Sequence, residues 1–171
     1  MPIPCYFPDF RAHERSYQMM AQVSGRAGRK NKQGKVIIQT HDPKHPIVQS
    51  VIRNDYLSMY QTQMSEREEF IYPPFYRLIN ITLKHKNNGI LTQAANVLAN
   101  SLRKIFGIRI FGPQAPLISR IQNYYIVNIL LKIEKKSSPA KAKWILNREA
   151  NNLKAIERFK TVMIQFDVDP M

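Results

Sequence analysis

Two arginines three residues apart carry the clearest chemical potential in this sequence. Arg26 and Arg29 stand in the segment Gln22-Val23-Ser24-Gly25-Arg26-Ala27-Gly28-Arg29. Guanidinium groups are permanently charged forks of N–H donors, and they suit phosphoryl oxygens on which charge builds up during phosphoryl transfer. A helix would bring Gln22 to the same side as both arginines, and Gly25 would leave space for a close ligand. The spacing indicates a polyphosphate site, or alternatively a flexible basic loop that touches any polyanion.

The elements that must position this segment lie in the first 75 residues. We expect a helix from about Phe10, capped by Asp9, that runs into the arginine segment. The apolar, β-branched residues 35–40 predict a buried strand, and the apolar spacing in residues 47–70 predicts one long helix. The Pro73-Pro74 pair favours extended backbone and coincides with a change in composition. These features divide the chain into residues 1–46, 47–75 and 76–171.

Residues 76–171 follow the order strand, helix, strand, strand, helix, strand. Ile79, Ile81 and Leu83 alternate with polar residues, which is typical of a strand with one wet face. The other elements are expected near residues 91–105 (helix), 108–111 (strand), 117–121 and 124–134 (a hairpin), 145–156 (helix) and 162–168 (strand). This order predicts an α+β domain, a β-α-β-β-α-β ferredoxin-like sandwich with helices on one sheet face.

Positive charge is concentrated in the second part of the chain. The 171 residues contain 26 Lys and Arg against 12 Asp and Glu, a net charge of +14. Residues 76–171 hold sixteen of these basic residues and only five acidic ones. A surplus of this size points to a polyanionic partner, and nucleic acid would be bound with strong salt dependence and little sequence preference.

Five residues are the candidates for DNA contact in this basic part. Tyr124 stands on the strand face opposite the core row, near Arg120, where its ring could stack on an exposed base. The candidates are Arg120, Tyr124, Lys132, Lys135 and Lys136. The alternative is a solvated surface rich in lysine, with Tyr124 as an ordinary cross-strand residue.

Several classes of protein do not fit the sequence. A single cysteine excludes a disulfide framework and a cysteine-based zinc site. No run of about 18 apolar residues is present, and the N-terminus lacks a basic signal-peptide region, so we expect a cytoplasmic protein without a membrane span. His41 and His45 have a helical metal-pair spacing, but Pro43 argues against a helix and no third ligand is near. We expect no bound metal.

The arginine segment resembles a known motif. Its pattern Gln-x-x-Gly-Arg-x-Gly-Arg is similar to the sixth conserved motif of superfamily-two helicases and translocases. The wider chain resembles the primosomal replication-restart DNA helicases (the primosomal protein N-prime, or PriA, family). The matching features occur in the family's order: the stretch 8–18 before the segment, then Gln39-Thr40-His41, Tyr72-Pro73-Pro74, Phe111-Gly112-Pro113 and Asp167-Val168-Asp169-Pro170. The resemblance covers residues 8–171, as the end of a RecA-like second helicase lobe followed by the C-terminal domain.

The resemblance implies a role for each matching residue. Arg26 and Arg29 would be arginine fingers that reach ATP bound between two helicase lobes. Gln22 and Gly25 would belong to the same nucleotide-facing surface. The implied parent enzyme uses ATP and magnesium to unwind DNA from 3′ to 5′, binds forked or single-stranded DNA, and contacts single-strand binding protein and primosome proteins.

The sequence also departs from the family pattern. It contains no Gly-x-x-x-x-Gly-Lys-Ser/Thr phosphate loop, no Asp-Glu-x-His magnesium box and no zinc-binding cysteines. We therefore expect no ATPase activity from this chain alone. A second hypothesis is a stand-alone ferredoxin-like nucleic-acid-binding module with no ATPase role, although the aromatic strand signature of RNA-recognition domains is absent.

Overall fold

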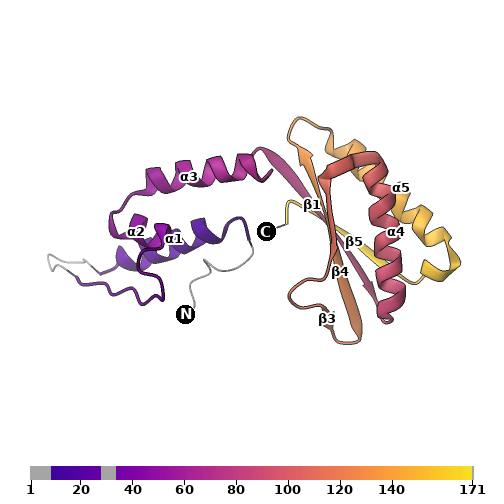
Figure 1. Cartoon of the computed structure of the whole chain (residues 1–171), viewed down its shortest axis with the longest axis horizontal. Coiled ribbons are helices and arrows are strands. Elements are labelled where there is room, and N and C mark those ends of the chain that lie inside the picture. Colours follow the sequence, from indigo (N-terminus) through magenta and orange to yellow (C-terminus); the bar gives the residue numbers. More distant parts are fainter. Residues whose placement is uncertain (1–8, 28–33, 171) are drawn as a thin grey trace. The chain divides into compact units, whose positions relative to one another are not determined.

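The computed structural model describes residues 9–27 and 34–170. The chain divides into two compact units, Met1–Phe70 and Ile71–Met171. The first unit contains the helices α1 (Ala12–Ser24), α2 (Pro46–Ile52) and α3 (Tyr56–Glu69), and the second contains a sheet with two long helices (Figure 1).

A small apolar cluster holds the three helices of the first unit together. Tyr17 and Met20 of α1 pack with Ile47 of α2 and Met59 of α3, and all four are buried. The start of α3 is fixed by Asp55, whose carboxylate accepts the backbone N–H of Ser58 at 3.0 Å. This cluster is small, and several large apolar side chains of the unit, such as Ile52, Tyr56 and Leu57, remain exposed.

The predicted strand at residues 35–40 is wrong for this structure. The segment has no regular secondary structure. Ile37 is 82% exposed and Val36 39% exposed, and only Ile38 of its apolar residues packs against the cluster of the first unit. A buried strand needs neighbouring strands to pair with, and every strand that the structure describes lies in the second unit. The β-branched pattern is therefore present without the pairing partners that would bury it.

The helices of the first unit also differ from the prediction at their ends. The expected long helix at 47–70 is two helices, because Asn54 takes a left-handed conformation with φ 53° and ends α2 before Asp55 begins α3. Helix α1 ends at Ser24, with Gly25 as its C-cap, whereas we expected it to run on into the segment that begins at Gly25. Its N-cap is Arg11, and Asp9 instead accepts the backbone N–H of Arg11 at 3.0 Å.

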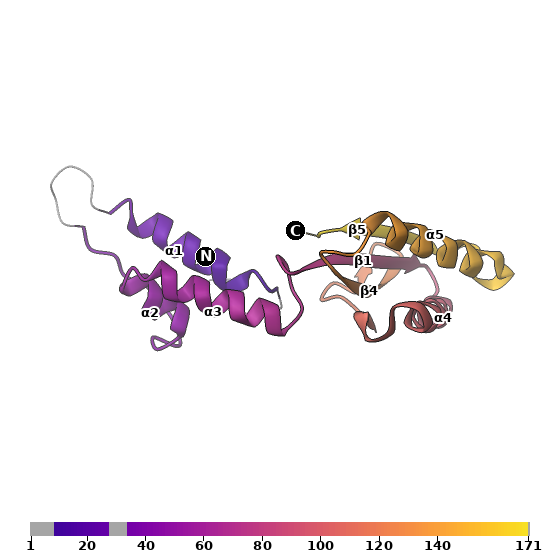
Figure 2. The same ribbon diagram turned by 90° about the horizontal axis from the view of Figure 1, so that it is seen from above.

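The second unit confirms the predicted ferredoxin-like α+β fold. Its elements follow the expected order, and the sheet is antiparallel throughout, with the strand order β2-β4-β1-β5. A short strand, β3, pairs with β4 as a hairpin. The elements are β1 (Tyr76–His85), α4 (Asn88–Phe106), a 3-10 turn (Gly107–Arg109), β2 (Ile110–Gln114), β3 (Arg120–Ile121), β4 (Tyr124–Glu134), α5 (Pro139–Ala155), a second 3-10 turn (Glu157–Phe159) and β5 (Met163–Val168) (Figures 1 and 2).

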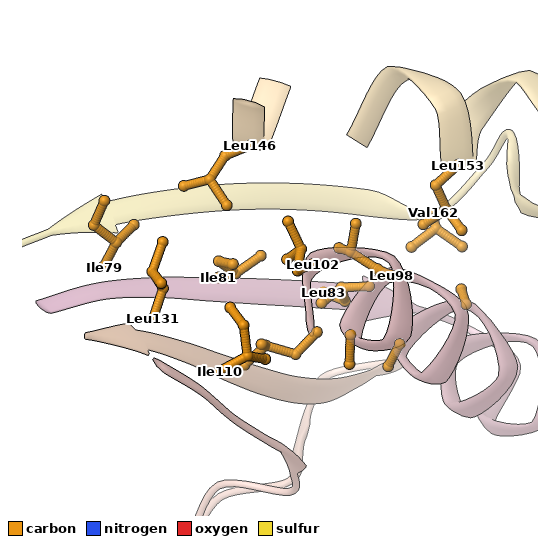
Figure 3. Packing of buried hydrophobic residues seen from close by; sticks show 14 of the residues in the cluster. Ile79, Ile81, Leu83, Leu98, Leu102, Ile110, Leu131, Leu146, Leu153 and Val162 are labelled. Atoms are coloured by element: carbon orange, nitrogen blue, oxygen red, sulfur yellow. The ribbon is translucent and has the colours of Figure 1, made fainter. Parts of the chain in front are cut away.

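The core of the second unit lies between one face of the sheet and the two helices. Alternate residues of β1 and β4 point to this side: Ile79, Ile81, Leu83, Ile129, Leu131 and Ile133, all at most 2% exposed. Leu98 and Leu102 of α4 and Leu146 of α5 pack against them (Figure 3). The opposite sheet face, which we call the open face, carries the polar residues Asn80, Thr82 and Asn128 among the apolar residues Leu78, Ile126 and Leu130.

The sequence explains where the two helices of the second unit begin. Helix α4 begins after Asn87, whose side chain accepts the N–H of Ile90, and its buried stripe includes three alanines that allow close approach to the sheet. Helix α5 begins after Ser138, with Pro139 in its first turn. A buried polar contact joins them, because the Ser101 hydroxyl of α4 donates to the Glu149 carboxylate of α5. This hydrogen bond lowers the pKa of Glu149 below its ordinary value.

Strand β2 contains one position that requires glycine. Gly112 has φ 90°, a conformation that residues with a side chain rarely adopt. A Cβ atom at this position would lie 2.9 Å from the backbone oxygen of Asn128 in β4. The pairing of β2 with β4 shifts register here, between Phe111 and Gln114.

Truncating the α4 stripe should destabilise the second unit. Leu98 is 1% exposed in the core, so Leu98→Ala should lower the free energy of unfolding by about 2–5 kcal/mol. Val97, one residue away, is 43% exposed, and Val97→Ala should change it by less than about 1 kcal/mol. Urea unfolding followed by circular dichroism measures both. An equal decrease in stability for the two variants would contradict the assigned core face of α4.

Candidate nucleotide and nucleic-acid sites

The end of α1 presents part of the predicted nucleotide site. Gln22, Gly25 and Arg26 are all exposed. The backbone keeps curling past the helix end, because Arg26 N–H donates to the Val23 carbonyl at 3.2 Å. Arg26 therefore follows Gln22 by about one turn of backbone, and their joint part in a nucleotide site remains a prediction. Arg29, the second predicted finger, lies outside the described residues.

Within the part of the chain that the structure describes, no internal contact holds the Arg26 guanidinium back from a ligand. Among residues 9–27 and 34–170, no carboxylate forms an ion pair with it. The Arg67 guanidinium is different, because it lies in an ion pair with Glu14 at 2.6 Å and is mostly buried. Arg67 belongs to the packing of the first unit, whereas Arg26 can reach a phosphate outside it.

We expected Arg120 to lie beside Tyr124. In the hairpin of β3 and β4, Arg120 instead lies opposite Tyr125, and Tyr124 lies opposite Ile121. Arg120 is opposite Tyr125 in the register, with its guanidinium carbon 5.1 Å from the centre of that ring. Tyr124, which is half-buried, has the ammonium of Lys86 5.7 Å from its ring centre. Both tyrosines thus pair with a cation, and the stacking role predicted for Tyr124 remains a prediction.

Lys132 is buried, in contrast to the exposed DNA contact expected of it. The residue is 5% exposed, and its ammonium lies 3.6 Å from the ring centre of Tyr72 and 4.7 Å from that of Phe111. Burial lowers the pKa of Lys132, and the faces of the two rings offset part of this by attracting the charged form. We therefore leave Lys132 out of the DNA-contacting surface that we propose below.

Lys135 and Lys136 lie where β4 ends and are both exposed. The Lys135 backbone N–H donates to the Phe75 carbonyl at 3.3 Å, and Ser137 N–H donates to the Glu134 carbonyl at 2.9 Å. These hydrogen bonds fix the turn while the two ammonium groups remain in solvent. Neither ammonium forms an ion pair with a described carboxylate, so the pair can bind phosphate oxygens directly.

The fold also gathers residues that our site prediction missed. Arg103, Lys104, Arg109 and Phe111 line one pocket of the second unit together with Lys132. Their proximity depends on the 3-10 turn after α4, which starts at Gly107 with φ 63° and bends the chain back toward β2. The sequence did contain a signal for this cluster. Arg103 and Lys104 stand in the last turn of an expected helix, and Gly107 follows directly after it.

Of the two histidines with metal-pair spacing, His45 has a structural role. The Nδ1 atom of His45 accepts the N–H of Ile47 at 3.3 Å as the cap of α2, and its ring packs edge-on against His13. No group of three or more His, Cys, Asp or Glu side chains suited to a metal ion occurs in the described part of the chain. In that same part, none of the helices has the length and apolar character needed to cross a membrane.

Comparison with known families decides the identity of the second unit. The sequence model described as "Primosomal protein N C-terminal domain" matches residues 68–171. The chain belongs to this family. The match confirms the resemblance to the PriA family.

Relatives extend the similarity to nearly the whole chain. The replication restart protein PriA of Bacillus subtilis is 36% identical over 167 residues, which cover 96% of this chain and 20% of the relative. PriA of Treponema pallidum is 34% identical over 169 residues, covering 96% and 24%. PriA of Chlamydia pneumoniae is 46% identical over 99 residues, covering 58% and 13%. The chain spans about a fifth of the length of the first two relatives.

Burial of Lys132 should make stability depend on pH above neutrality. Its pKa is below the ordinary lysine value of 10.5, so between the two values the unfolded state binds more protons than the folded state. The free energy of unfolding of the natural protein should rise with pH in this window relative to Lys132→Met. Urea unfolding at several pH values between 7 and 10 measures the difference. Lys136→Met, at an exposed position, should show no such trend, and parallel profiles for both variants would refute the effect.

Proposed function

We propose that this chain forms the C-terminal part of an ATP-dependent 3′-to-5′ DNA helicase that acts in replication restart and primosome assembly. The observation that carries the proposal is the family match of residues 68–171, on a unit with sixteen basic and five acidic residues. The relatives named above are replication restart proteins, which supports this role. DNA as the substrate and the cytoplasm as the place of action are parts of the proposal.

The second unit is proposed to hold DNA through its phosphates. Lys135 and Lys136 supply exposed ammonium groups at the end of β4, and Arg120 and Tyr124 supply a cation and a ring at the hairpin. Each phosphate neutralised by a cation releases condensed counterions, which favours binding at low salt. Phosphate contacts of this kind hold a fork in position without reading its sequence.

The first unit is proposed to complete an ATP site whose phosphate loop this sequence lacks. Exposed Gln22 and Arg26, with Arg29 three residues further on, fit the nucleotide-facing side of such a site. Bound ATP with magnesium would supply the phosphoryl transfer that drives unwinding. The two arginines would stabilise the charge on the transferred phosphoryl group. Single-strand binding protein and primosome proteins are the protein partners implied by this role.

Charge reversal at the end of β4 tests the DNA-binding part. The double variant Lys135→Glu, Lys136→Glu should bind forked and single-stranded DNA about tenfold more weakly at 100 mM salt. The slope of log affinity against log salt should fall by about 1 for each phosphate that the variant no longer neutralises. Lys35→Glu, Lys44→Glu changes the net charge equally on exposed residues of the first unit and should leave the slope near its original value. Identical slopes for all three proteins would exclude Lys135 and Lys136 from the interface.

Alanine substitution tests the arginine fingers in a full-length protein that contains this chain and a phosphate loop. Arg29→Ala should reduce DNA-stimulated ATP turnover by about 10³-fold, because an arginine finger acts mainly on the transition state. DNA affinity should stay within about threefold. Arg53→Ala, at an exposed position of the same unit, should leave turnover unchanged. If Arg29→Ala weakened DNA binding as much as turnover, the residue would be a DNA contact and not a finger.

A further inference from the structure

A basic pocket lies at one corner of the second unit. The last turn of α4 and the 3-10 turn meet β2 and the end of β4 there, and the cavity between them measures about 590 Å³. This volume falls in the range of pockets that bind small molecules. Its lining combines cationic side chains with apolar ones, among them Ile108, which is 88% exposed. The pocket can therefore receive a ligand that has both an anionic and a flat apolar part.

Cations outnumber carboxylates in this pocket by four to one. The guanidinium of Arg103 donates hydrogen bonds to the Gly112 carbonyl and to the Asn100 side chain, so it mainly holds the wall of the pocket together. Arg109 lies in an exposed ion pair with Glu134 at 2.5 Å, which water screens and a phosphate can share. Lys104 is exposed. Lys104 and Arg109 are thus the two groups placed to bind an anion.

Phe111 provides the flat apolar surface of the pocket. The residue is 42% exposed, and the ammonium of Lys132 lies 4.7 Å from the centre of its ring and 3.6 Å from the ring centre of Tyr72. This contact holds the ring in place, so little conformational entropy is lost when a second flat group stacks on it. A held, half-exposed aromatic ring beside accessible cations is the combination found in single-strand binding grooves.

We propose that this corner pocket binds one unpaired nucleotide of single-stranded DNA, with the base on Phe111 and a phosphate at Lys104 and Arg109. The proposal rests on the DNA-binding function proposed above and adds a preference for unpaired bases. Bases inside a duplex are stacked on their neighbours and cannot enter a concave pocket, whereas an unpaired base can. An acidic peptide would satisfy the cations but would gain nothing specific from the ring.

Oligonucleotides with and without bases separate stacking from charge. The binding of fluorescein-labelled dT8 and of an eight-unit abasic oligonucleotide with the same phosphates is compared by fluorescence anisotropy. The natural chain should bind dT8 roughly 5- to 100-fold more tightly than the abasic chain. Phe111→Ala should remove most of this preference while its affinity for the abasic chain stays within about twofold.

Two further variants keep the test decisive. Phe111→Leu retains an apolar side chain for packing and should lose the preference for bases as Phe111→Ala does. Trp144 is 62% exposed on α5 and does not line the pocket, so Trp144→Ala should keep the preference. Circular dichroism and urea unfolding establish that each variant is folded. If Phe111→Ala does not fold, Phe111→Leu alone shows whether the preference for bases depends on the ring.

The outcomes also separate this inference from the proposed function. If the Phe111 variants keep the base preference, or bind both oligonucleotides more weakly by the same factor, the pocket is not a nucleotide site, although salt-dependent DNA binding through Lys135 and Lys136 stands. If poly-glutamate of equal charge competes as well as dT8 and Phe111→Leu abolishes that competition, the pocket is a site for acidic chains and the inference is overturned. If the natural chain binds no DNA at low salt, the proposed function and the inference both fail.

Discussion

The antiparallel pairing of β1 with β4 determines which side chains of the second unit meet the helices and which meet solvent. Ten residue pairs, from Tyr76 opposite Glu134 to His85 opposite Tyr125, hold these strands in one register. A slip by one residue would turn Ile129, Leu131 and Ile133 outward and bring Lys132 and Asn128 into the core. Burial of the core therefore fixes the strand register, and the register fixes where cations and rings lie on the open face and in the corner pocket.

Cations on the second unit repeatedly lie against aromatic rings. Lys86 lies over Tyr124, Arg120 over Tyr125, Lys132 over both Tyr72 and Phe111, and Arg148 over Trp144. Such contacts hold long side chains in place while most of the charged groups stay wet. A polyanion that binds here meets cations whose positions are partly set beforehand, and the entropy cost of binding is smaller.

The sequence predicted the second unit well because its pattern is local. The alternation of Ile79, Ile81 and Leu83 and the stripe of α4 each place one face in the core whatever the rest of the chain does. The first unit was harder, because residues 35–40 need pairing partners that composition cannot supply, and Asn54 breaks a helical pattern without a proline or glycine. Of the sites, Lys135 and Lys136 could be predicted as exposed, but the burial of Lys132 could not, since it depends on rings 60 and 21 residues away in the chain.

Gly112 connects the integrity of the sheet edge with the behaviour of the protein in solution. Any larger residue would push β2 away from the Asn128 carbonyl and release the hydrogen-bonding groups along the outer side of β4. β4 is the longest strand of the sheet, and the backbone groups that β2 would leave unpaired along it are a template on which another chain can add a strand. Glycine at this position thus limits the length of strand edge that is open to pairing with another chain.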